Sequence, residues 1–170
     1  MKRAARTATY VSKKHRCDNA DLVAALRKLG AIVVLDGGGD VKNVDLSNTA
    51  DNFKLASLHL KRLAHLRTLC LSGTPITNEN LAEHVDYSDL IVLDLSRTSV
   101  TDTGMVCLEQ AIQLEWLNLD GTRVTDACIH HLFPLVNLRW VSLRDTPVTD
   151  EGMQQLFDMH PDLTIPRAVR

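Results

Sequence analysis

Leucine and valine recur along most of this chain at a fixed spacing. Five stretches each open on an apolar residue, place two more at alternating positions, and then reach a threonine. Alternation with a period of two is typical of a β-strand that buries one face. The stretches begin at Val41, Leu66, Leu90, Leu114 and Leu138, which are 25, 24, 24 and 24 residues apart. A repeat of roughly 20 to 30 residues predicts a solenoid, in which each unit buries its apolar side against its neighbours.

The second half of each unit predicts a helix. Thr101 can act as the N-cap, Asp102 lies in the first turn, and Met105 stands where it could contact Val100. A carboxylate in a first turn is stabilised by the helix dipole, which explains the aspartates that follow these threonines. Equivalent apolar pairs are Val124 with Ile129 and Val148 with Met153, and one turn later come Leu108, Leu132 and Leu156. We therefore expect strands and helices to alternate.

Read in full, the later copies follow L-x-x-L-x-L-x-x-T-x-V-T-D-x-G and then Leu or Met, as in LIVLDLSRTSVTDTGM at 90 to 105. This pattern resembles the leucine-rich repeat family, in its short bacterial-type form. The resemblance implies an α/β fold, a right-handed solenoid with a concave parallel sheet and outer helices. It also implies a non-catalytic module for protein–protein interaction. One departure is the threonine at 49, 74, 98, 122 and 146, where many members of the family have asparagine or cysteine.

The two ends of the chain depart from the repeat. Residues 1–17 carry six Lys and Arg and no acid, which indicates a flexible basic tail. Residues 18–40 predict an N-terminal cap made of a helix after Asn19, a strand at 31–35 and a glycine turn. The repeats are expected over 41–165, with Leu163 to Ile165 as a last edge strand, and 166–170 as a second tail.

Composition limits the classes of function. The formal net charge is −2, and because the tail is basic, the rest of the chain is acidic. A general nucleic-acid surface is therefore not expected; tethering to nucleic acid or an anionic membrane through residues 1–17 is the alternative function. The four cysteines lack C-x-x-C spacing and are read as free thiols. Neither a secretory leader nor a membrane span is apparent, so we expect a cytoplasmic protein.

No motif in the sequence indicates catalysis. The glycines at 37–39 are flanked by Asp36 and Asp40, which would repel a phosphate, so they predict a turn. His130 and His131 are adjacent and would point about 100° apart on a helix, which does not favour a shared metal ion. We therefore predict no enzymatic activity, no catalytic residue, no metal, no cofactor and no small-molecule substrate.

The outward positions of the predicted strands carry the candidate binding site. The third residue of each unit is Asn43, Thr68, Val92, Trp116 and Trp140, so parallel pairing brings the only two tryptophans side by side. Exposed aromatic side chains are typical of protein-binding surfaces. Alternatively, the two rings only cover each other and the sheet, or serve as a crystal or dimer contact. The predicted partner-binding residues, for a protein partner of unknown identity, are Ile91, Val92, Asp94, Glu115, Trp116, Asn118, Arg139, Trp140 and Arg144.

Overall fold

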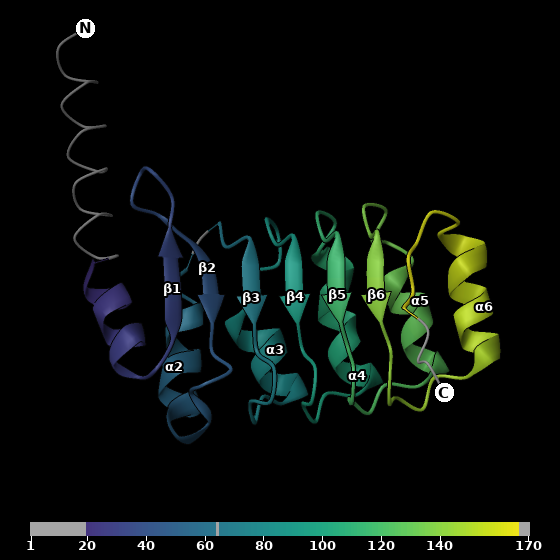
Figure 1. The fold of residues 1–170 in the computed structure, drawn as a ribbon, viewed down its shortest axis with the longest axis horizontal. Coiled ribbons are helices and arrows are strands. Elements are labelled where there is room, and N and C mark those ends of the chain that lie inside the picture. Colours follow the sequence, from purple (N-terminus) through teal and green to yellow (C-terminus); the bar gives the residue numbers. More distant parts are fainter. Residues whose placement is uncertain (1–19, 64, 167–170) are drawn as a thin grey trace, which may run out of the picture.

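One six-stranded sheet runs the length of the molecule. The structure, a computed structural model, describes residues 20–63 and 65–166, so the predicted basic tail and Asn19 lie outside the described residues. The strands follow each other in chain order across the sheet, and β2 to β6 are all parallel, whereas β1 is antiparallel to β2 (Figure 1). They are β1 (Ile32–Leu35), β2 (Val41–Asp45), β3 (Thr68–Cys70), β4 (Val92–Asp94), β5 (Trp116–Asn118) and β6 (Trp140–Ser142).

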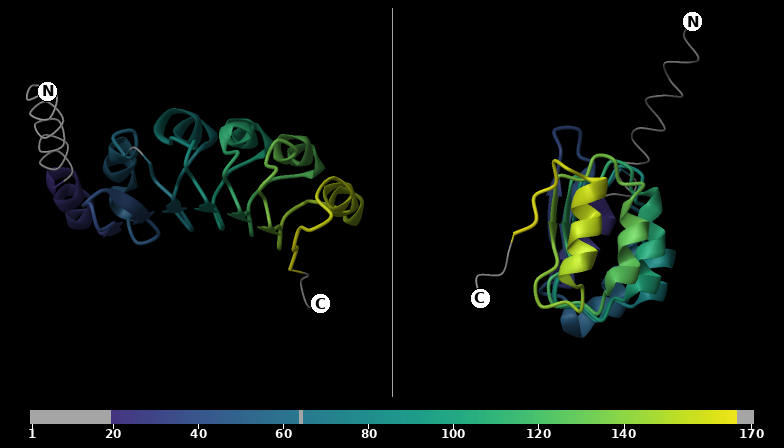
Figure 2. Two further views of the ribbon diagram at one scale, coloured as in Figure 1. Left: turned by 90° about the horizontal axis from the view of Figure 1, so that it is seen from above. Right: turned by 90° about the vertical axis from the view of Figure 1, so that its right-hand side faces the viewer.

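The helices form a second layer on one side of this sheet. They are α2 (Phe53–Leu60), α3 (Asn78–His84), α4 (Asp102–Met105), α5 (Ile129–Leu132) and α6 (Asp150–Met159), with 3-10 segments η1 (Ala50–Asn52), η2 (Val106–Gln110) and η3 (Asp126–Cys128). Seen from above, the helix layer follows an arc whose outer side faces away from the sheet (Figure 2). The opposite surface of the sheet, here called the inner face, carries none of α2 to α6. The predicted α/β solenoid is confirmed.

The repeat period stacks equivalent side chains into an apolar column. Leu69, Leu93, Leu117 and Val141 occupy the same place in successive strands and are fully buried between the sheet and the helices. Leu81, Leu108, Leu132 and Leu156 close the core from the helix side, and none of them is exposed. Complete burial of such a side chain contributes about 1.5 to 3 kcal/mol. Aliphatic stacking between neighbouring coils therefore holds the fold together.

The repeated threonines provide hydrogen bonds to backbone carbonyls where the chain leaves the sheet. In each of the five coils the threonine hydroxyl donates a hydrogen bond of 2.6 to 2.7 Å to the carbonyl oxygen three residues earlier. Four of the five threonines are also buried, namely Thr49, Thr74, Thr98 and Thr122. A buried carbonyl without a partner costs about 1 to 3 kcal/mol. The hydroxyl thus removes this cost at the turn.

A second set of polar contacts connects each coil to the next. Asp126 accepts hydrogen bonds from the backbone N–H and the hydroxyl of Thr149, at 2.8 and 2.7 Å. Asp102 binds Thr125 in the same way, at 2.7 and 2.9 Å. Asn78 contacts Thr101 through both its amide oxygen and its amide nitrogen. The aspartates therefore do more than interact with a helix dipole: they form an inter-coil ladder.

Thr101 is the N-cap residue of α4, as predicted, but its hydroxyl makes no capping hydrogen bond and instead accepts one from Asn78 of the preceding coil. Thr125 and Thr149 do cap their own helices, accepting bonds from the N–H groups of Ala127 and Gly152.

Both ends of the solenoid are covered in part. Residues 20–28 are helical and bury Leu22, Val23 and Leu26, while Arg27 donates a hydrogen bond to the carbonyl of Val33 on the edge strand β1. At the other end, the predicted strand from Leu163 to Ile165 is reduced to a single parallel bridge between Trp140 and Thr164. Pro161 and Pro166 flank this segment and lack the N–H that a longer ladder requires.

Candidate functional site

Three rows of side chains cross the inner face at right angles to the strands. The middle row contains Asn43, Thr68, Val92, Trp116 and Trp140, which the strand register pairs in this order. The register predicted from the 24-residue spacing is therefore confirmed. Because neighbouring strands lie about 4.8 Å apart, equivalent side chains in this row come into direct contact.

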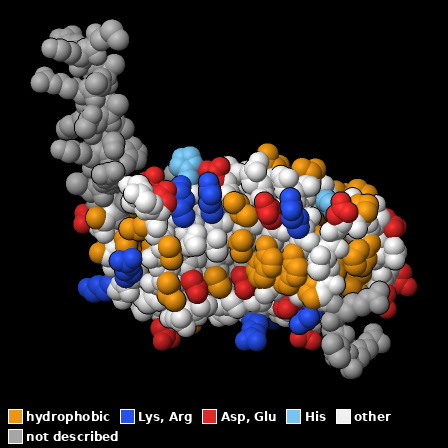
Figure 3. Space-filling model, turned by 45° about the horizontal axis from the view of Figure 1, so that its top comes forward, with side chains coloured by type: hydrophobic (Ala, Val, Ile, Leu, Met, Phe, Trp, Pro, Cys, Tyr) orange, Lys and Arg blue, Asp and Glu red, His pale blue; other side chains and the backbone are white. Residues whose placement is uncertain are grey.

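The two tryptophans form a parallel stack. Their ring centroids are 4.3 Å apart and the ring planes differ by 3°. Both residues are half-buried, as is Val92 next to them in the row. The rings cover each other, as the alternative without a binding role predicts, yet part of each ring stays exposed. We call Val92, Trp116 and Trp140 the tryptophan patch; Figure 3 shows hydrophobic side chains gathered on this face between rows of charged ones.

The first row consists of the residues that directly precede the middle row in the chain, and it is mostly charged. It consists of Lys42, Arg67, Ile91, Glu115 and Arg139. Arg139 and Glu115 form an exposed ion pair, with Nε and Oε2 4.0 Å apart. An exposed pair of this kind contributes at most about 1 kcal/mol. Ile91, Glu115 and Arg139, all predicted site residues, therefore border the tryptophan patch directly.

The third row is polar, but most of its polar side chains already form hydrogen bonds within the protein. Asp94 and Asn118 each accept a hydrogen bond from the backbone two residues later, and Asn118 also contacts the Asp94 carboxylate at 3.4 Å. Ser142 is buried, and its hydroxyl has no hydrogen-bond partner among the described residues. Arg144 is exposed on the turn after β6, at the far end of the strand from Arg139. Arg144 is thus the predicted residue that lies apart from the patch.

Cys70 belongs to the third row, and the sequence interpretation did not include it. Burial raises the pKa of its thiol to about 11, and burial likewise raises the pKa of Cys128 to about 12 and that of Cys107 above its usual value. These thiols therefore stay protonated at neutral pH, which makes them poor nucleophiles.

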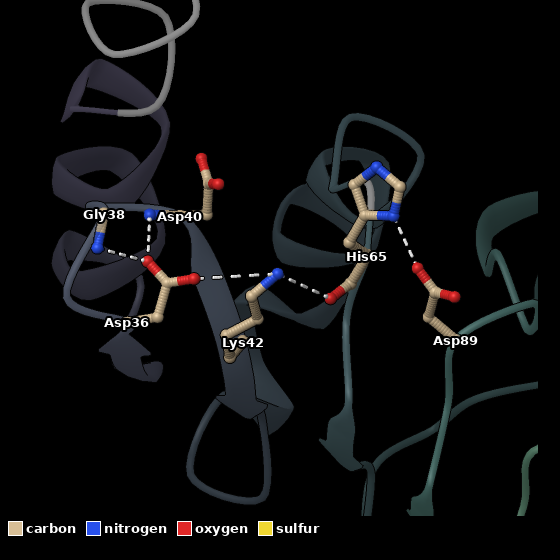
Figure 4. A network of polar contacts seen from close by, with 6 residues as sticks. All are labelled: Asp36, Gly38, Asp40, Lys42, His65 and Asp89. Atoms are coloured by element: carbon tan, nitrogen blue, oxygen red, sulfur yellow. Dashed lines mark hydrogen bonds and ion pairs between the residues drawn. The ribbon is translucent and has the colours of Figure 1, made fainter.

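A polar hollow of about 370 Å³ lies beside the first row, and sequence reasoning missed it. It is lined by Lys42, His65, Arg67, Asp89, Ile91 and Gln113, and is called the cationic hollow below. His65 contacts Asp89 with Nδ1 and Oδ2 2.5 Å apart, and Lys42 lies 3.8 Å from Asp36 (Figure 4). His65 has a positive φ of 63°, a backbone conformation that the sequence around it does not predict.

Asp36 belongs to the glycine turn that the sequence predicted. Its carboxylate accepts hydrogen bonds from the backbone N–H groups of Asp40 and Gly38 (Figure 4). These bonds, that of Asp40 foremost, hold the pKa of Asp36 below its usual value. The turn is therefore organised around its own carboxylate rather than around a phosphate.

The two adjacent histidines differ from expectation. The rings of His130 and His131 do not diverge: their centroids are 3.6 Å apart and their planes differ by 45°. His131 is engaged by Glu109, with Nδ1 and Oε1 2.6 Å apart. In the described part of the chain, no three His, Cys, Asp or Glu side chains are grouped as metal ligands.

Comparison with known proteins agrees with the geometry. A family model described as "Leucine Rich repeat" matches residues 88–108, which comprise β4, α4 and the turns around them. The chain thus contains a leucine-rich repeat and has the fold of leucine-rich repeat proteins. Proteins with this repeat commonly use the concave side of the solenoid to bind other proteins. Within the described ranges, no helix of this chain has the length and apolar content of a membrane span.

Two solved structures are similar to this chain. One is a leucine-rich repeat protein of Leptospira interrogans, with 22% identity and a TM-score of 0.49 over 65% of this chain and 27% of that one. The other is the leucine-rich repeat ectodomain of the Arabidopsis receptor kinase HAESA, solved with a peptide hormone, with 17% identity and a TM-score of 0.53 over 90% of this chain and 33% of that one. The chain thus spans a third or less of either protein. A comparison with curated proteins found no match.

Proposed function

We propose that this chain is a non-catalytic interaction module that binds a protein partner on its inner face, with the tryptophan patch as the anchor. Around the patch, we assign partner contacts to Ile91, Glu115 and Arg139 on one side and to Asp94 and Asn118 on the other. Arg144 would contact only a partner that extends to the far end of β6.

The tryptophan stack is the observation that carries this proposal. The leucines of the strands are buried in the core, whereas Trp116 and Trp140 stand next to each other on the face that none of α2 to α6 covers. Tryptophan is the side chain most enriched among residues that dominate binding energies. A rigid stacked pair also loses little conformational entropy when a partner covers it.

The mixed charges beside the patch favour a protein over a polyanion. Glu115 and Arg139 pair with each other, and Asp94 adds a negative group on the opposite side. A nucleic acid would require a continuous positive surface. A protein can instead match alternating charges, which set orientation and specificity.

Photo-crosslinking tests which face a partner occupies. A benzoylphenylalanine at position 139 lies on the inner face beside the patch, and one at position 155 lies exposed on α6, on the helix side. With extract from the source cells, we expect position 139 to give a discrete crosslinked partner and position 155 to give none of it. Equal crosslinking of the same partner from both positions, or from position 155 alone, would contradict docking on the inner face.

A further inference from the structure

The cationic hollow and the tryptophan patch lie next to each other on the same face. Arg67 precedes β3, while the two tryptophans stand on β5 and β6. Ile91 lines the hollow and is followed by Val92 of the patch. The hollow and the patch therefore adjoin at Ile91 and Val92.

Arg67 is the cation of this hollow that is left for a partner. Lys42 forms an ion pair with Asp36, and His65 makes a hydrogen bond with Asp89. Within residues 20–63 and 65–166, the guanidinium of exposed Arg67 has neither an ion pair nor a hydrogen bond. A guanidinium binds a carboxylate in a planar, two-bond geometry, and does so more strongly in a hollow than on an open surface.

The other charges of the first and third rows do not offer an equivalent position. Glu115 and Arg139 neutralise each other. The carboxylates of Asp45 and Asp94 each accept a hydrogen bond from the backbone of their own turn, at 2.8 and 2.9 Å. A partner lying along the first two rows thus meets a positive site near β3 and an apolar site over β4 to β6.

The strand spacing fixes the separation of these two sites. Positions on β3 and β5 are about 10 Å apart and positions on β3 and β6 about 14 Å, since each strand adds about 4.8 Å. An extended peptide advances about 3.3 Å per residue, so these distances correspond to about three or four residues.

We propose that the partner binds as an extended segment that crosses β3 to β6, with an apolar or aromatic side chain on the tryptophan patch and an aspartate or glutamate three or four residues away in the cationic hollow, against Arg67. This inference rests on the proposed function, because it assigns the chemistry of the segment that docks on the same face.

A random peptide library provides the test. Phage displaying random twelve-residue peptides are selected on the immobilised full chain, after removal of phage that also bind the Trp116→Ala/Trp140→Ala variant. We expect the enriched peptides to carry Asp or Glu three or four residues from Trp, Phe or Leu. Synthetic peptides of these sequences should bind Arg67→Glu about five- to tenfold more weakly than the unmodified chain, since a charge pair becomes a repulsion.

Two controls make the result specific. Arg123→Glu introduces the same charge change at an exposed arginine on the turn after β5, and should alter binding less than about twofold. Moving the acidic residue next to the apolar anchor in the synthetic peptide should remove the difference between the Arg67→Glu variant and the unmodified chain.

The possible failures are distinguishable. Enriched peptides that depend on the tryptophans but show no acidic residue at this spacing, or that bind Arg67→Glu unchanged, would overturn the assignment of Arg67 and leave the tryptophan anchor intact. If no tryptophan-dependent peptide is enriched at all, the anchor itself is contradicted, and this inference falls with it.

Discussion

Replacing both tryptophans of the patch by alanine is expected to weaken partner binding about a hundredfold, which corresponds to about 3 kcal/mol. Each ring is half-buried before any partner arrives, so its remaining exposed area, rather than its whole surface, contributes to binding. The affinity of the crosslinked partner for Trp116→Ala/Trp140→Ala and for the unmodified chain, measured by titration calorimetry, checks this value.

The single variants should not be additive. The rings lie 4.3 Å apart in a parallel stack, so removing Trp140 uncovers one face of Trp116 and changes its exposure. We expect the two single losses to sum to more than the loss in the double variant. The matched control is Leu55→Ala/Leu58→Ala, which truncates two exposed leucines of α2 on the helix side. Equal binding losses in the control and the tryptophan variant would show that the effect is not specific to the patch.

Replacing Gly152 by alanine is expected to destabilise the protein by about 1 to 2 kcal/mol, although alanine is the better helix former by about 1 kcal/mol. A Cβ at this position would collide with the carboxylate of Asp126 from the preceding coil. Asp126 would have to move, and would lose its two hydrogen bonds to Thr149. Urea unfolding followed by circular dichroism measures the change in the free energy of unfolding.

A double-mutant cycle assigns this cost to the inter-coil ladder. In an Asp126→Ala background, Gly152→Ala should cost much less than in the unmodified chain, because the colliding carboxylate is gone. Gly37→Ala is the control: a Cβ there has no atom within 4 Å, so the change should stay within about 0.5 kcal/mol. A stabilisation by Gly152→Ala would mean that helix propensity outweighs the ladder.

Cys128 shows how a coil accommodates a side chain at the position of Gly104 and Gly152. It follows Thr125 by three residues, as the glycines follow Thr101 and Thr149. That coil begins with the 3-10 turn η3 instead of an α-helical turn, and Asp102 keeps both bonds to Thr125. The chain thus changes its local helix type rather than giving up the ladder, which limits the expected cost of a substitution.

The fold was predictable because its main determinant is periodic. The spacing of Leu66, Leu90, Leu114 and Leu138 sets strand position and register, and the register alone brings Trp116 next to Trp140. The same columns also predict that Ile91, Glu115 and Arg139 border the pair. Strand register and the neighbours of the tryptophan pair therefore follow from the repeat spacing alone.

Features that depend on side-chain geometry between coils were not predictable in this way. The hydrogen bonds that Asp102 and Asp126 accept from threonines of the next coil depend on the side-chain rotamers of these aspartates. In the sequence, the helix dipole alone is enough to explain an aspartate in the first turn. The cationic hollow needs the positive φ of His65, a conformation more often adopted by glycine. The last edge strand was overestimated, since apolar residues at 163 and 165 favour a strand while the flanking prolines limit it to one bridge at Thr164.

The central claim is that a partner covers the tryptophan patch. The chain has only two tryptophans and both belong to the patch, so labelling with 5-fluorotryptophan gives one fluorine NMR signal for each. When the crosslinked partner is added to saturation, we expect both signals to shift and to become less sensitive to exchange from H₂O to D₂O, because binding removes solvent from the rings. Saturating binding that leaves both signals and their solvent sensitivity unchanged would contradict docking on the tryptophan patch.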